Sequence, residues 1–265
     1  MLVKEKVQQA VGILEEYGMD CWLTFVRESS ITGDPMLAFL SETDVTWHSA
    51  FIVTRSGRSY AIVGELERQS AEDMGVYDEI LSFVEGFKEP FQKTMKAINP
   101  ASIAVNFSKT SEIADGLSHG MYLTLVDLLS EIGFADRLVS AEKVVSSLRA
   151  RKTEYELDRI RRAINKTEEI FAAVHPFIRP GKSEKEIAAF MANLVEEAGL
   201  ELAWGAEHCP AVFTGPDTAG AHYRPTDRLV ERGHVLNMDF GVKVDGYCSD
   251  MQRTFYVLKE GETEA

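Results

Sequence analysis

Residues 237–250 read Asn-Met-Asp-Phe-Gly-Val-Lys-Val-Asp-Gly-Tyr-Cys-Ser-Asp, and this stretch predicts a β-hairpin. Asp245-Gly246 lies between two β-rich runs, which is a strong pattern for a two-residue hairpin turn. Side chains alternate between the two faces of a strand, so this turn makes Asp239 and Asp250 diagonal neighbours on one face. A turn one residue earlier would place them directly opposite each other. Either register brings two carboxylates together.

Two carboxylates held this close repel each other unless a proton or a cation removes the repulsion. Asp239 also lies in the apolar run 235–240, where burying a lone carboxylate would be costly. A divalent metal ion, which readily accepts carboxylate oxygen ligands, solves both problems. The alternative is a pair of edge-strand aspartates that only keep the sheet soluble. The hairpin alone does not decide between a metal site and a solubilising edge.

A histidine upstream of the hairpin is a further candidate for the site. His222 lies in the loop Gly-Pro-Asp-Thr-Ala-Gly-Ala-His-Tyr-Arg-Pro-Thr-Asp-Arg-Leu-Val-Glu-Arg-Gly-His, 17 residues before Asp239. A loop histidine taken alone is an ordinary surface or hydrogen-bonded residue. Its spacing from Asp239, with a strand between them, makes His222 a candidate functional residue.

The order of these residues resembles one metallopeptidase family. His222, Asp239, Asp250 eleven residues later, and the pair Arg253-Thr254 fall in the order seen in the creatinase, aminopeptidase P and prolidase group (M24), which has the pita-bread fold. The resemblance implies that Asp239 and Asp250 bind metal and that His222 contacts substrate and handles a proton. It further implies a pair of divalent ions, manganese or cobalt, a proline-containing Xaa-Pro peptide as substrate, and a homodimer.

The family's metal site has five ligands, and only two of them have counterparts here. A histidine and two glutamates should follow the second aspartate, but the sequence ends at Ala265 without them. We therefore expect a truncated part of a longer Xaa-Pro peptidase, and we expect the 265-residue chain to be inactive by itself. Two alternatives remain open. One is a creatinase-like, metal-free amidinohydrolase, which the presence of both aspartates disfavours. The other is a non-catalytic peptide-binding pita-bread module.

The pattern along the chain predicts two domains. Residues 1–138 alternate between strand-like and helix-like stretches, which predicts an α/β domain with a mixed sheet. These residues also resemble the creatinase-type N-terminal domain. Residues 139–178 predict a long, charged helical stretch, and the chain becomes strand-rich after Gly199. Residues 139–265 therefore correspond, by the resemblance, to the first half of an α+β pita-bread domain.

Composition excludes some partners. The chain has 28 Lys and Arg against 42 Asp and Glu, a net charge of −14, which would repel nucleic acid and anionic lipid. No stretch reaches the roughly 20 apolar residues needed to span a bilayer. Cys21, Cys209 and Cys248 show no CxxC spacing, which favours a reducing compartment, and we expect each to be a small buried residue. These properties favour a cytoplasmic protein.

Overall fold

The computed structural model describes residues 2–215 and 223–263, and the chain forms two compact units. Unit 1 is Met1–Thr153 and unit 2 is Glu154–Ala265. The helices and strands of unit 1 are α1 Leu2–Tyr17, β1 Cys21–Val26, β2 Ser49–Thr54, β3 Ser59–Gly64, α2 Arg68–Met74, β4 Glu79–Phe83, α3 Lys88–Ile98, β5 Ile103–Val105, α4 His119–Ser130, β6 Leu138–Ser140 and α5 Glu142–Ala150.

The sheet of unit 1 is mixed, as the sequence predicts. Its strand order is β4-β3-β2-β1-β5-β6, with β2 antiparallel to both of its neighbours and the other pairs parallel. The β2–β3 connection is a hairpin with Arg55-Ser56-Gly57-Arg58 in its turn, and Gly57 adopts the positive φ (88°) that the turn requires.

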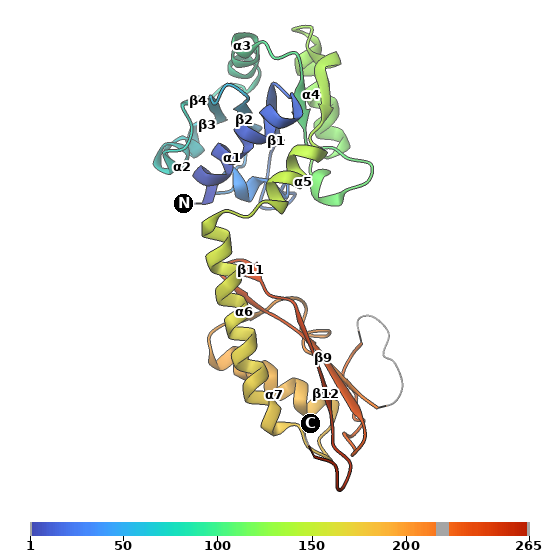
Figure 1. Cartoon of the computed structure of the whole chain (residues 1–265). Coiled ribbons are helices and arrows are strands. Elements are labelled where there is room, and N and C mark those ends of the chain that lie inside the picture. Colours follow the sequence, from blue (N-terminus) through green and yellow to red (C-terminus); the bar gives the residue numbers. More distant parts are fainter. Residues whose placement is uncertain (1, 216–222, 264–265) are drawn as a thin grey trace. The chain divides into compact units, whose positions relative to one another are not determined.

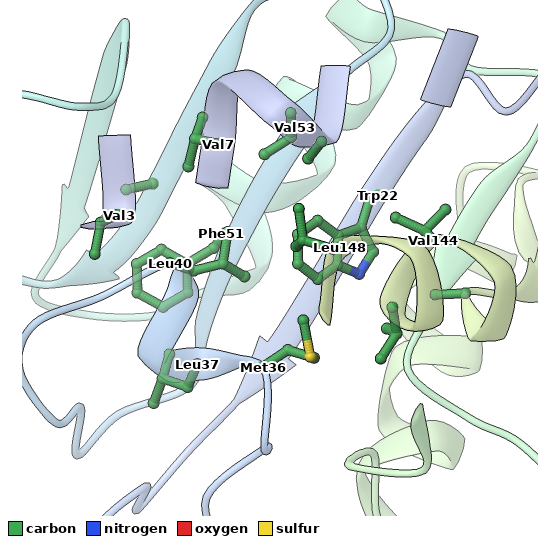
Figure 2. Packing of buried hydrophobic residues seen from close by; sticks show 14 of the residues in the cluster. Val3, Val7, Trp22, Met36, Leu37, Leu40, Phe51, Val53, Val144 and Leu148 are labelled. Carbon is green, nitrogen blue, oxygen red and sulfur yellow. The ribbon is translucent and has the colours of Figure 1, made fainter. Parts of the chain in front are cut away.

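Both faces of this sheet are covered. Every residue of β1 and β2 is buried, and alternate residues enter two separate apolar cores. One core contains residues of α1 and α5 together with Trp22 and Phe51. Figure 2 shows part of it, with Val144 and Leu148 of α5 next to Trp22 of β1. The other core contains residues of α3 and α4. Unit 1 is thus a three-layer α/β domain.

The long helical stretch predicted over residues 139–178 is divided in the structure. Residues 138–140 form β6, α5 follows, and a second helix begins only at Glu154. Lys6, a fully buried lysine of α1, donates hydrogen bonds to the carbonyl oxygens of Leu148 (2.7 Å) and Arg151 (3.0 Å). These bonds satisfy backbone groups that a helix end leaves without partners. α5 therefore belongs to unit 1, and the contacts divide the chain after Thr153 rather than after residue 138.

Unit 2 combines two helices with two short sheets. Its elements are α6 Glu154–Val174, α7 Glu184–Glu197, β7 Glu201–Leu202, β8 Ala211–Thr214, β9 Val235–Phe240, β10 Val242–Val244, β11 Tyr247–Cys248 and β12 Met251–Tyr256. The sheets have the orders β12-β9-β8 and β11-β10-β7. Figure 1 shows α6 and α7 together on one side of these strands. Ser183 and Glu186 form a capping box at the start of α7.

No helix among residues 2–215 and 223–263 is both long enough and apolar enough to cross a membrane.

Candidate metal centre

The hairpin around Asp245-Gly246 has the first of the two registers that the sequence allowed. Asp245 (φ 46°) and Gly246 (φ 83°) both have positive φ angles, as a tight two-residue hairpin turn requires. Gly241 lies between β9 and β10. On the turn side of Gly241, Val244 pairs with Tyr247, and on its other side Asp239 pairs with Gln252. Both pairs fit one continuous register, which puts Gly241 opposite Asp250. Asp239 and Asp250 are therefore diagonal neighbours on one face.

The two aspartates lie on the face of the sheet that the helices leave uncovered. Met238 and Phe240 of β9 are fully buried in a core with residues of α6 and α7, and the Phe240 ring contacts that of Phe171 edge-on (5.7 Å between centroids). Asp239 alternates with them and is half-buried, whereas Asp250 is exposed. Asp250 is thus open to solvent, whereas one carboxylate oxygen of Asp239 is buried and its strand is anchored from behind.

A close backbone approach shapes the chain just before Asp250. A Cβ atom on Gly241 would lie 1.9 Å from the carbonyl oxygen of Ser249, so only glycine fits there. The buried Ser249 hydroxyl accepts a hydrogen bond from the Val242 backbone N–H (3.0 Å) and shares another with the Thr167 hydroxyl of α6 (2.6 Å). These contacts fix the backbone from which Asp250 projects. Sequence reasoning missed Thr167, because nothing local links it to a residue 82 positions away.

The pair Arg253-Thr254 separates onto the two faces of β12. Thr254 lies on the aspartate face, where its hydroxyl accepts a hydrogen bond from the Asn237 amide (2.9 Å). Arg253 lies on the opposite face, 5.3 Å from the Phe171 ring centroid and 3.7 Å from the carboxylate of Glu168. Arg253 thus anchors the hairpin to α6 and is directed away from the aspartates.

His222 lies outside the described residues, but the residues on either side of its segment are well defined. Thr214 ends β8 before it, and Tyr223 follows it directly. The Tyr223 ring contacts Phe213 (5.5 Å between centroids, 61° between planes). Phe213 pairs with Asn237, so it lies on the same face of the sheet as Asp239. The chain therefore leaves and re-enters the described structure beside the aspartate face.

The cysteines behave as structural residues, with one exception to the prediction. Cys21 and Cys209 are buried, and burial raises the pKa of both thiols, to about 12 for Cys21. The Cys209 thiol donates to the carbonyl oxygen of Gly241 (3.5 Å), next to the site. The expectation that Cys248 is buried is wrong: it is exposed, because β11 is an edge strand.

The possible metal ligands on the aspartate face suit a hard divalent cation, but they are few. Carboxylate oxygens from Asp239 and Asp250 are the ligand type that manganese and magnesium prefer. Within residues 2–215 and 223–263, no group of three or more His, Cys, Asp and Glu side chains is placed to hold a metal ion. The residues present therefore fit part of a metal site, and a complete coordination shell needs further donors.

Residues 158–265 match the model of metallopeptidase family M24. This part of the chain is similar to metallopeptidase family M24. A protein of Mycoplasma genitalium named "Putative Xaa-Pro aminopeptidase" is 28% identical over 188 residues, which cover 67% of this chain and 51% of that protein. The chain spans about half the length of the curated relatives it matches. The hairpin with Asp239 and Asp250 lies within the M24 match.

Solved structures show the same fold. The Xaa-Pro dipeptidase from Bacillus anthracis has a TM-score of 0.64 and 22% identity, with 97% of this chain and 66% of that chain covered. The dipeptidase PepE from Mycobacterium ulcerans has a TM-score of 0.61 and 24% identity, with 96% and 64% covered. The predicted fold class, an α/β domain followed by part of a pita-bread domain, is confirmed.

Proposed function

We propose that this chain takes part in metal-dependent hydrolysis of Xaa-Pro peptide bonds. One observation carries the proposal: the hairpin within the M24 match has the register that makes Asp239 and Asp250 diagonal neighbours on an uncovered sheet face. Two like-charged groups at such a short distance are stable together only with a counter-charge or a shared proton. The names of the M24 relatives, which include Xaa-Pro aminopeptidase and dipeptidase, support the substrate class.

The aspartates would hold a pair of divalent cations, manganese or cobalt, with further ligands from outside the described residues. When bound, such a cation polarises a peptide carbonyl and makes water more acidic. Asp239 is the better fixed ligand, because its strand lies between β8 and β12 and its neighbours Met238 and Phe240 are buried. Asp250 depends on the Gly241–Ser249 contact for its direction. Thr254 and Asn237 border the site and can orient a substrate amide.

His222 would contact the substrate and hold or transfer a proton during cleavage. Histidine suits this role because its ordinary pKa lies near neutral pH. The next residue in the sequence, Tyr223, contacts Phe213, which lies on the Asp239 face.

We further propose that residues 1–265 by themselves hydrolyse peptides poorly or not at all. Two carboxylates leave most of a cation's coordination to water and provide no complete two-metal site. The shortage of ligands in the described part of the chain also favours a second candidate function, a peptide-binding module that does not cleave its ligand.

Manganese binding tests the proposal directly. Titration of the chain with Mn²⁺, followed by the electron paramagnetic resonance signal of the free ion, should show binding. Asp239→Asn and Asp250→Asn should each weaken Mn²⁺ binding at least about tenfold. Affinity falls by this much even when the substituted residue only hydrogen-bonds to a metal ligand. Asp245→Asn is the matched control, since Asp245 is an exposed aspartate in the turn of the same hairpin. Equal affinity in all four proteins would refute the metal site.

Hydrolysis of Xaa-Pro peptides in the presence of Mn²⁺ separates the two functions. Turnover that Asp239→Asn abolishes supports the peptidase and overturns the proposed inactivity of residues 1–265. Binding of an uncleaved proline-containing peptide that neither Mn²⁺ nor Asp239→Asn affects supports the binding module instead.

Two properties implied by the resemblance also stay proposals. A homodimer would show as twice the 29.6 kDa chain mass in light scattering. A cytoplasmic location is supported by three cysteines that form no disulfide in the structure.

A further inference from the structure

Unit 1 has a cavity at one edge of its sheet that no role proposed so far uses. β1 and β5 are adjacent parallel strands, so their carboxyl ends lie at the same edge. The chain after β1 turns to one face, where Met36 and Leu40 enter the core that contains α1 and α5. The chain after β5 turns to the other face, where α4 packs in the second core. Where neighbouring connections diverge in this way, α/β sheets leave a crevice in which ligands bind.

The cavity at this position has a volume of about 430 Å³ and lies entirely within unit 1. Pockets for small ligands have volumes of roughly 300–1,000 Å³. One side of the lining comes from residues 25–35, at the end of β1 and after it, and the other from residues 115–121, which lead into α4. Volume and position therefore suit a small organic molecule.

A buried polar network holds both sides of the cavity in place. The Asp34 carboxylate, from the first side, accepts hydrogen bonds from the Met36 backbone N–H and the Asn106 side-chain amide (both 2.8 Å). Asn106, which directly follows β5, also accepts a hydrogen bond from the Trp22 indole (2.7 Å). Gly116, from the second side, lies against the Asp34 carboxylate, which a Cβ atom there would overlap. The cavity is therefore preformed, which lowers the cost of binding a ligand.

Two opposite charges line the cavity without neutralising each other. Arg27 directly follows β1, and Asp115 lies on the other side, before α4. Among residues 2–215 and 223–263, neither side chain is part of an ion pair, so their charged atoms are farther apart than about 4 Å, the limit of a salt bridge. The Asp115 carboxylate is held in place by a hydrogen bond from the Ser108 backbone N–H (3.0 Å). A ligand that bridges Arg27 and Asp115 needs an anionic and a cationic group.

Part of the wall between these charges is apolar. Phe25, Val26 and Met121 line the cavity and are otherwise buried. Phe25 and Met121 belong to the core with α3 and α4, and Val26 belongs to the core on the opposite face of the sheet. A ligand with an apolar side chain gains free energy by covering this surface.

We propose that this cavity binds an apolar α-amino acid, with its carboxylate on Arg27 and its ammonium group on Asp115. The side chain of the amino acid lies against Phe25 and Met121. A carboxylate can accept two parallel hydrogen bonds from an arginine, which fixes its orientation. An apolar α-amino acid carries the three groups that the lining requires in a molecule small enough for the cavity. The site belongs to unit 1 alone and does not depend on the proposed metal centre.

Binding of leucine to the whole chain, measured by calorimetry, tests the proposal without any substitution. N-acetyl-leucine lacks the ammonium charge, leucinamide lacks the carboxylate, and glycine lacks the apolar side chain. Each should bind at least about tenfold more weakly than leucine, because each loses either a hydrogen bond between charged groups or the burial of apolar surface. Absence of leucine binding at millimolar concentrations, or equal affinity for the four compounds, would overturn the proposal.

Two substitutions locate the charged contacts. Arg27→Gln should weaken leucine binding about tenfold but leave leucinamide binding unchanged, since leucinamide has no carboxylate to lose. Asp115→Asn should weaken leucine binding by a similar factor and leave N-acetyl-leucine binding unchanged. Arg58→Gln and Asp136→Asn are the matched controls, because these exposed residues lie at the opposite edge of the sheet, in the β2–β3 turn and before β6.

Asp239→Asn separates this site from the proposed metal centre. Because Asp239 belongs to unit 2, leucine should bind Asp239→Asn as it binds the unsubstituted chain. Loss of leucine binding in Asp239→Asn, or full leucine binding in both Arg27→Gln and Asp115→Asn, would place the amino acid elsewhere and overturn the proposal. A chain that binds leucine as expected but fails to bind Mn²⁺ or cleave peptides would refute the proposed function and leave the amino-acid site standing.

Discussion

The sheets of the two units differ in how many faces they bury. In unit 1, β1 and β2 are buried at every position, because helices cover both faces of the sheet. In unit 2, β9 alternates between buried and accessible residues, and β12 alternates between half-buried and exposed ones. A strand buried on both faces is largely apolar, whereas a half-covered strand can present polar groups every second residue. The uncovered face of unit 2 is where Asp239 and Asp250 lie.

The difference explains why unit 2 can carry the proposed metal site. A charged side chain in β1 or β2 would be desolvated whichever face it occupied, which is costly without a partner. In β9, Met238 and Phe240 pack against residues of α6 and α7. The position between them, Asp239, therefore does not need to contribute to this core. The same strand is thereby anchored in the core and carries Asp239, a proposed metal ligand.

The largest expected effect is a contrast between adjacent substitutions. In β2, Phe51→Ala and Ile52→Ala face opposite cores, and each should destabilise unit 1 by about 2–5 kcal/mol. In β9, Met238→Ala should destabilise unit 2 by about 2–5 kcal/mol. Its neighbour Asn237→Ala loses only the bond to Thr254 and should cost about 1 kcal/mol or less.

Urea unfolding monitored by tryptophan fluorescence can measure these effects, since Trp22 and Trp47 report on unit 1 and Trp204 reports on unit 2. The two units can unfold in separate transitions, so each variant is compared with the transition of its own unit. If Asn237→Ala destabilised unit 2 as strongly as Met238→Ala, the aspartate face would be buried and the contrast would be lost.

A smaller effect is expected where the hairpin passes from β9 to β10. Gly241→Ala introduces a Cβ 1.9 Å from a backbone oxygen, so the strands must shift. Such overpacking costs about 1–3 kcal/mol. Because the displaced oxygen belongs to Ser249, the residue before Asp250, Mn²⁺ affinity should fall as well.

The matched control for Gly241→Ala is Gly12→Ala in α1, where an added Cβ has no atom within 4 Å. It should stabilise unit 1 by about 0.5–1 kcal/mol, because glycine is unfavourable inside a helix. A Gly241→Ala variant with wild-type stability and Mn²⁺ affinity would show that the Ser249 backbone does not determine the direction of Asp250.

Local patterns in the sequence predicted the features that depend on local physics. Asp245-Gly246 predicted the hairpin, because few other residue pairs adopt positive φ twice in succession, but it left two registers open. The break between α5 and α6 was missed, since the hydrogen bonds that satisfy the end of α5 come from Lys6, 142 or more positions away in the sequence. Glu184 reads as an ordinary acidic residue at a helix start, and only the fold brings Thr214 and Tyr223 to it. The short strands β6 and β7 depend likewise on partners remote in the sequence.

The smallest expected effect separates the turn from the ion pair attached to it. Asp245 lies 2.7 Å from the guanidinium of Arg162 in α6, and both side chains are 52% exposed. Asp245→Asn removes the charge, yet asparagine also tolerates positive φ in such turns. An exposed pair contributes about 0–1 kcal/mol, so unit 2 should lose no more than that, and the loss should vanish in 1 M salt. A larger loss that persists in salt would mean that Asp245 fixes the hairpin through its own turn geometry, and Asp245→Asn would then alter the strand register that brings Asp239 to Asp250.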